Sequence, residues 1–159
     1  MQFIIELDGQ MNLGELSYIR KESSLAFEPY DGRHGCSTLI INDIELVVGD
    51  ENTVLFTEGY FPEQFWVKSK LNIPESKPGK LSVDRKFFSA KENEGMSIRL
   101  TQPAEWEVTH DPFSGWICIG DKFAVGNKVI EYCSRQKVVL SEEGELLSLW
   151  IKPHIKMDV

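Results

Sequence analysis

The sequence has few of the residues that form disulfide frameworks, metal centres or helices. Its three cysteines, Cys36, Cys118 and Cys133, lack the close paired spacing of metal ligands or disulfide partners. This usage favours reduced thiols, so we expect a cytoplasmic protein without a disulfide framework. Alanine, the strongest helix former, occurs only at positions 26, 90, 104 and 124, which indicates that helices are scarce.

Other missing features exclude whole functional classes. No stretch approaches the roughly 20 apolar residues of a membrane helix, and the first eight residues, where Glu6 interrupts an apolar run that has no basic residue before it, predict no signal peptide. Glycine-rich phosphate-binding signatures are absent, so we expect no nucleotide enzyme of those classes and no cofactor. The net charge of −8 repels nucleic-acid phosphates and anionic bilayers, and neither is an expected partner.

The residues that are present describe one globular, β-rich domain. The chain has 159 residues, 42% of them hydrophobic and 26% charged, which suffices for a single core spanning residues 1–159. Valine, isoleucine and threonine supply 29 residues, a composition that favours strands. We expect a mainly β, single-domain sandwich or rolled antiparallel sheet with at most one or two short helices. Apolar or alternating runs predict strands at 3–7, 16–20, 25–28, 38–41, 44–48, 54–56, 65–73, 97–101, 106–110, 116–119, 123–125, 129–133, 137–140 and 146–152.

Turn residues predict three hairpins, one helix and one loop. Asn42-Asp43 and Gly120-Asp121 each separate two apolar runs and suit tight turns, and residues 140–146 form a longer loop containing Gly144. Asp84 is the predicted N-cap of a helix over residues 84–91. Two prolines and a glycine in residues 74–80 predict a surface loop, a candidate divider between two sheet layers.

A weak internal similarity links residues 28–49 and 111–126. Both contain an acidic-Pro-aromatic-polar-Gly pattern that runs into a predicted hairpin. The similarity indicates either a structural repeat or a coincidence of turn chemistry with strand alternation.

Acidic residues are concentrated in the first 63 residues. This segment holds 12 acidic and 3 basic residues, whereas residues 64–159 hold 13 and 14. The leading hypothesis is a non-enzymatic protein whose acidic half binds a basic protein partner; alternatively, the acids merely maintain solubility. A toxin-neutralising protein of the bacterial immunity type is one concrete version, based on charge and size alone. The residues assigned to this interaction are Asp43, Glu45, Asp50, Glu51, Glu58 and Glu63.

Aromatic residues at 60–66 support a second hypothesis, a β domain that binds a sugar or another small ligand. Tyr60 and Trp66, or Trp116 beside a glycine turn, supply rings that can stack on a ligand or anchor a protein interface. The simpler interpretation is that Phe65 and Trp66 close one end of a small core.

A third hypothesis is a cysteine-dependent enzyme. His34 and Cys36 lie two residues apart on a glycine-containing loop, so an imidazole and a thiol can point the same way. The signatures of known cysteine hydrolases are absent around Cys36. The other candidate metal ligands are scattered and predict no metal site: His110, Asp111, Cys133 and His154.

Carboxylate pairs are the last candidate chemistry. General acid–base catalysis needs one carboxyl in an apolar setting that raises its pKa. Glu105 and Glu107, on either side of Trp106, have such a neighbour. We interpret this trio instead as part of a strand on which Trp106 and Val108 face one side while both carboxylates face solvent.

Overall fold

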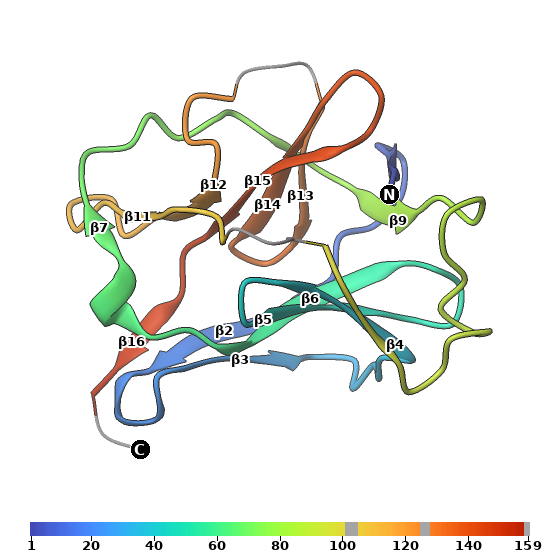
Figure 1. The fold of residues 1–159 in the computed structure, drawn as a ribbon, viewed down its shortest axis with the longest axis horizontal. Coiled ribbons are helices and arrows are strands. Elements are labelled where there is room, and N and C mark those ends of the chain that lie inside the picture. Colours follow the sequence, from blue (N-terminus) through green and yellow to red (C-terminus); the bar gives the residue numbers. More distant parts are fainter. Residues whose placement is uncertain (101–104, 125–127, 158–159) are drawn as a thin grey trace.

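The fold is an unclosed β-sandwich. The computed structural model describes residues 1–100, 105–124 and 128–157, which form two seven-stranded mixed sheets and a two-stranded ribbon (Figure 1). The predicted mainly β fold is therefore confirmed. The helical segments of the described chain are two 3-10 turns, η1 (Arg20–Glu22) and η2 (Glu63–Phe65), and none of its helices is long and apolar enough to span a membrane.

The first sheet comes mostly from the acidic half of the chain. Its interior pairs are antiparallel, whereas the edge strands β10 and β16 join in parallel. Alternation places Leu39 and Ile41 of β4 in the core and Thr38 and Ile40 on the outer face. In sheet order the strands are β10 (Ser97–Arg99), β4 (Ser37–Ile41), β5 (Ile44–Val48), β6 (Val54–Tyr60), β3 (Ser24–Pro29), β2 (Gly14–Ile19) and β16 (His154–Lys156).

The second sheet comes from the second half of the chain and also has parallel edge strands, β7 and β8. In sheet order its strands are β7 (Val67–Lys68), β11 (Val108–His110), β12 (Ile117–Gly120), β15 (Leu146–Ile151), β14 (Gln136–Leu140), β13 (Lys128–Cys133) and β8 (Lys77–Pro78). The ribbon pairs β1 (Phe3–Glu6) with β9 (Lys80–Val83). The sequence did not predict β8, β9 or β16.

The core lies between the two sheets. Leu39 and Leu46 of the first sheet and Ile119 and Leu149 of the second are at most 1% exposed and belong to one buried cluster. Burying one such side chain fully contributes about 1.5–3 kcal/mol. The two halves of the chain therefore stabilise each other through a shared apolar layer.

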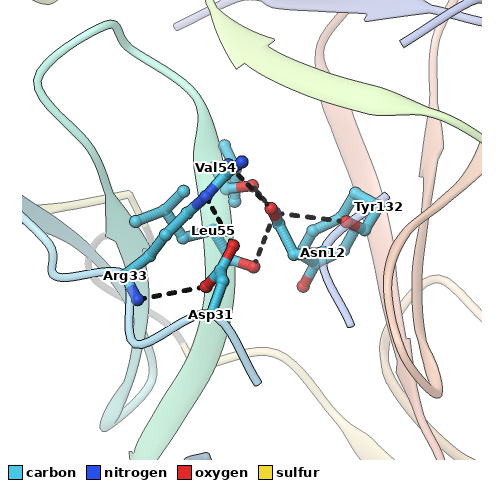
Figure 2. Close-up of polar contacts among 6 residues, drawn as sticks. All are labelled: Asn12, Asp31, Arg33, Val54, Leu55 and Tyr132. Atoms are coloured by element: carbon cyan, nitrogen blue, oxygen red, sulfur yellow. Dashed lines mark hydrogen bonds and ion pairs between the residues drawn. The ribbon is translucent and has the colours of Figure 1, made fainter. Parts of the chain in front are cut away.

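Asn12 adds a polar connection between the sheets (Figure 2). Its Nδ2 atom donates to two carbonyl oxygens of β6, at 3.2 and 2.9 Å, and to one of β13, at 3.4 Å. Its Oδ1 atom accepts a hydrogen bond from Arg33 Nη1 at 3.1 Å, and Arg33 Nε pairs with Asp31 Oδ2 at 2.8 Å. These contacts anchor the loop that leads into β4.

Residues 69–76, which we call the strap, cross the outer face of the second sheet. They run from β7 at one edge of that sheet to β8 at the other (Figure 1). The strand predicted over residues 65–73 is therefore wrong beyond β7, because the backbone runs across the sheet and not along its edge. The stretch 74–80 contains the end of the strap, β8 and the start of β9, so it is only partly a loop.

Apolar and polar contacts hold the strap in place. Leu71 is buried against the outward-facing Trp150 of β15, and its backbone N–H donates to the carboxylate of Asp111 at 3.1 Å. Lys137 Nζ donates to Pro74 O at 2.6 Å. The outer face of the second sheet is thus covered by this chain's own residues.

Two of the three predicted hairpins are confirmed. Asn42 adopts a positive φ of 56° between β4 and β5, and Gly144 one of 89° between β14 and β15. The hairpin at Gly120-Asp121 is wrong, because β12 pairs with β11 and β15 and Phe123 lies in an exposed turn. Of the two similar segments, residues 39–48 form a hairpin and residues 117–120 a single strand; residues 125–126 lie outside the described part.

Residues 84–91 form turns, and the predicted helix there is wrong. The buried side chain of Asn52 donates to the carbonyls of Val83 and Phe88, at 3.0 and 2.7 Å, and accepts from Ala90 N at 2.8 Å. The bond to Ala90 N takes up a group that a helix over residues 84–91 would pair internally. A tertiary contact from a residue more than 30 positions away therefore replaces the local structure.

Candidate functional site

A cleft of about 390 Å³ opens between the two sheets, at the end of the sandwich that carries the β4–β5 turn. Three segments line it: that turn, the chain after β6, and the chain that leads into β11. Five aromatic residues and three carboxylates face it, and we call it the aromatic cleft. Its lining residues are Asn42, Asp43, Tyr60, Phe61, Pro62, Phe65, Trp66, Glu105, Trp106, Glu107 and Val108.

A glycine shapes the wall formed by the first sheet. Gly59 has a φ of 128°, and a Cβ atom there would lie 3.0 Å from the carbonyl oxygen of Asp43. Glycine thus permits the β4–β5 turn to pack against the end of β6. The following Tyr60 is 54% exposed, whereas Phe61 is buried and donates its N–H to Ser23 O at 2.7 Å. The Tyr60 ring therefore lies at the rim of the cleft.

Trp66 is a half-buried ring held from several sides. Its centroid lies 4.9 Å from Tyr18, 5.0 Å from Phe61 and 5.2 Å from His110. Burial, with a smaller contribution from Lys68, lowers the pKa of His110, so the imidazole that meets the indole edge is neutral at pH 7. Packing of this kind gives a rigid aromatic wall.

The opposite wall depends on Asn42. Its Nδ2 donates to Trp106 O at 2.9 Å, and its Oδ1 accepts from Trp106 N at 2.9 Å. The Trp106 ring approaches Gly120, where a Cβ atom would lie 2.7 Å from the ring. The sequence predicted both Asn42 and Gly120 as turn residues but neither role in holding Trp106, because nothing local indicates a partner 64 positions away.

The carboxylates of the aromatic cleft differ in their contacts. Asp43 and Glu105 are exposed. Glu107 Oε1 accepts hydrogen bonds from Lys122 Nζ and Thr109 Oγ1, each at 3.3 Å. β11 begins only at Val108, but the expected pattern of exposure holds, since both glutamates are exposed and Val108 is buried.

The other acidic residues assigned to partner binding lie elsewhere. Asp50 and Glu51 are exposed in the β5–β6 turn, at the opposite end of β5 from Asp43. Glu63 forms an ion pair of 2.6 Å with Arg20. Glu45 and Glu58 face outward from β5 and β6. Of the predicted interaction residues, the aromatic cleft brings together Asp43, Tyr60 and Trp66.

Trp116 does not belong to the aromatic cleft. It is half-buried on the outer side of the second sheet and packs with Leu71 of the strap. Lys137 Nζ lies 4.6 Å from the centre of its ring. A cation of this chain thus occupies the position that a stacked ligand would need.

The contacts of Cys36 disfavour a nucleophilic thiolate. The thiol Sγ donates to the carbonyl oxygen of Ala90 at 3.2 Å. Burial, and then the charges of Glu94 and Asp50, raise the pKa of this thiol. His34 is exposed on the preceding loop. Nucleophilic cysteines need the opposite trend, a lowered pKa beside a base.

The remaining candidates for chemistry stay dispersed. No group of three histidine, cysteine, aspartate or glutamate side chains that could hold a metal ion occurs within the described residues. Burial raises the pKa of Cys118 to about 12, and Cys133 is fully buried. Comparison with protein-family models, curated proteins and solved structures finds no match for this chain.

Proposed function

We propose that this protein is a non-enzymatic binding protein whose aromatic cleft receives a cationic side chain of a basic protein partner. The observation that carries the proposal is the combination of aromatic rings with carboxylates in one cleft of about 390 Å³. A cation over an aromatic face gains about 0.5–2 kcal/mol. Carboxylates at the same site add charge-assisted hydrogen bonds, which are stronger than neutral ones.

The charge distribution supports the same partner chemistry. Strands β2 to β6 come from residues 14–60, within the segment that holds 12 acidic and 3 basic residues. One layer of the sandwich is therefore acidic, while the other is nearly balanced. Such an asymmetry attracts and orients a basic protein before contact, an effect that salt weakens.

We propose a cytoplasmic location, and a basic toxin is one candidate for the partner. All three cysteines are thiols outside any disulfide, which suits a reducing compartment. Capture of a toxin or nuclease with a basic surface would identify the protein as one that neutralises it.

A matched pair of variants tests the cleft. The probes are a short alanine-rich peptide with one arginine and a matched peptide with neutral citrulline in its place. Binding is measured by the change in tryptophan fluorescence, to which Trp66 and Trp106 of the cleft contribute. The variant Asp43→Asn/Glu105→Gln should weaken arginine-peptide binding about tenfold, and high salt should do the same. The control Asp50→Asn/Glu51→Gln removes the same charge at the far end of β5 and should bind like the wild type.

The outcome separates this function from the sugar-binding alternative, which the pairing of Tyr60 with Trp66 in one cleft favours as second candidate. Equal binding of the arginine and citrulline peptides would contradict the proposal. If neutral saccharides change the tryptophan fluorescence and the arginine peptide does not, the cleft is assigned to a sugar.

A further inference from the structure

The outer face of the first sheet carries two carboxylates directly opposite each other. Glu45 of β5 and Glu58 of β6 are cross-strand partners, both half-buried. Directly opposed side chains have Cβ atoms about 4.5–5.5 Å apart, and like charges in this position are destabilising. The described ion pairs include neither residue. The folded protein therefore maintains an unfavourable pair of negative charges on this face.

Two arginines of neighbouring segments, Arg33 and Arg99, contact other groups. Arg33 lines the same depression as the two glutamates, but its guanidinium contacts Asn12 and Asp31 (Figure 2). Arg99 lies one strand beyond β4, opposite Ile40, and donates to the carbonyl of Asn42. Both of these arginines therefore contact other groups, and none of the described ion pairs supplies Glu45 or Glu58 with a cation.

The two glutamates lie in a depression of about 340 Å³ with apolar and hydroxyl surfaces around them. Val47 and Phe56, the cross-strand pair next to the glutamates, supply apolar surface. Thr38 and Ser97 add a pair of hydroxyls 2.6 Å apart. Val47 and Phe56 are nearly buried, so they form the apolar floor under the two carboxylates, against which the stem of an arginine can pack.

The depression and the aromatic cleft are lined by near neighbours on the same two segments of the chain. Glu58 faces the depression, and Tyr60, two residues further along β6, lines the cleft. Asp43 and Glu45 are related in the same way on the β4–β5 hairpin. Alternate side chains of an extended partner segment lie about 7 Å apart, so one such segment can present one side chain to the depression and the next but one to the cleft.

We infer that an extended basic segment of the partner protein lies on this outer face, with one cationic side chain in the aromatic cleft and an arginine bridging Glu45 and Glu58. The inference rests on the proposed function and names the form of the partner. Arginine suits the second position because its planar fork can donate to both carboxylates at once, whereas lysine is a point charge.

Two peptides and two protein variants test the inference. The peptides are Ala-Arg-Ala-Arg-Ala and Ala-Arg-Ala-citrulline-Ala, capped at both ends. The wild-type protein should bind the first peptide about tenfold more tightly, because only its second arginine can bridge the two glutamates. A factor of ten corresponds to about 1.4 kcal/mol. The variant Glu45→Gln/Glu58→Gln should abolish this difference and bind the second peptide like the control Asp50→Asn/Glu51→Gln, which has the same net charge.

The possible results distinguish the two proposals. If the advantage of the second arginine survives in Glu45→Gln/Glu58→Gln, or if a lysine there binds as well as arginine, the bridging arginine is wrong and the cleft proposal stands. If neither peptide changes the tryptophan fluorescence or the amide resonances of residues 43–45 and 58–60, both proposals fail. Thermal unfolding of each variant confirms that the fold is intact.

Discussion

Glu58 carries a half-buried carboxylate opposite Glu45, on the outer face of the first sheet. Burial, and then the charge of Glu45, raise its pKa above the ordinary glutamate value. The raised pKa means that the folded protein holds a proton on Glu58 more tightly than the unfolded chain does. Ionised Glu58 therefore opposes folding, a cost that the proposed binding role would explain.

We predict that Glu58→Gln stabilises the protein while weakening its binding to a basic segment. At pH 7 the unfolding free energy should rise by roughly 0.2–1 kcal/mol, the usual size of a cross-strand pair effect. Because the pKa is raised on folding, the cost of the charge is complete above the folded pKa and absent below the unfolded one. The gain from glutamine should therefore shrink as the pH falls through this window, as measured by urea unfolding at several pH values.

The exposed turn residue supplies the control. Glu51→Gln removes the same charge from the β5–β6 turn and should change the unfolding free energy by less than about 0.5 kcal/mol. A loss of stability in Glu58→Gln at pH 7 would show that Glu58 has a stabilising partner and would contradict our interpretation of the pair.

Among the elements, local patterns predicted most accurately a strand whose neighbour along the chain is also its neighbour in the sheet. The run Ile44–Val48 was predicted with its observed bounds, because alternation and the Asn42-Asp43 turn act within a few residues. The edge strands β8 and β16 pair in parallel with distant segments. Parallel partners lie far apart in sequence, so a local pattern does not predict the pairing, even at residues 97–101, where it predicts the strand β10.

Contacts between segments distant in sequence account for two of the wrong local predictions. Asn52 takes up the polar groups around residues 84–91, and Gly120 accommodates the ring of Trp106 instead of closing a hairpin. The aromatic stretch at 60–66 and the acidity of Asp43 were visible in the sequence. Their meeting with Trp106 in one cleft was not, because it depends on how the two sheets are layered.

The strap is the element whose anchoring is most directly testable. Lys137 is 6% exposed; its Nζ donates to Pro74 O at 2.6 Å and lies 4.6 Å from the Trp116 ring centre. Lys137→Met keeps the apolar stem but removes both contacts. The substitution removes about 1.5 kcal/mol of stabilisation from the hydrogen bond and the cation–π contact. Hydrogen exchange of strap amides such as Leu71 should therefore accelerate about tenfold.

The same substitution on the other sheet is the control for the strap. Lys156→Met on β16 breaks an exposed ion pair with Glu15 and should leave strap exchange unchanged. Unaltered exchange at Leu71 in Lys137→Met would mean that apolar packing and the bond to Asp111 suffice, and that Lys137 does not hold the strap.

At the scale of the whole molecule, the aromatic cleft exists only while the two sheets stay in place, since its walls come from both. The contacts that fix their relation are therefore part of the site. Thr57 of β6 and Tyr132 of β13 are fully buried, and their hydroxyl oxygens lie 2.6 Å apart. Tyr132 donates its proton to Gln136 Oε1 at 3.0 Å, so the Thr57 hydroxyl donates to the phenolic oxygen.

We predict that Tyr132→Phe destabilises the protein by about 1–3 kcal/mol, because it leaves the buried hydroxyl of Thr57 and the carbonyl of Gln136 without this partner. Thr57→Val should destabilise the Tyr132→Phe variant less than it destabilises the wild type, because the Thr57 hydroxyl has already lost its partner in that variant. The double-mutant cycle should give a coupling free energy of about 0.5–3 kcal/mol. Urea unfolding, followed by tryptophan fluorescence and by circular dichroism, should show one coincident transition in every variant. Two separate transitions would mean that the sheets are independently stable, and the cleft between them would then be a docking interface rather than a fixed site.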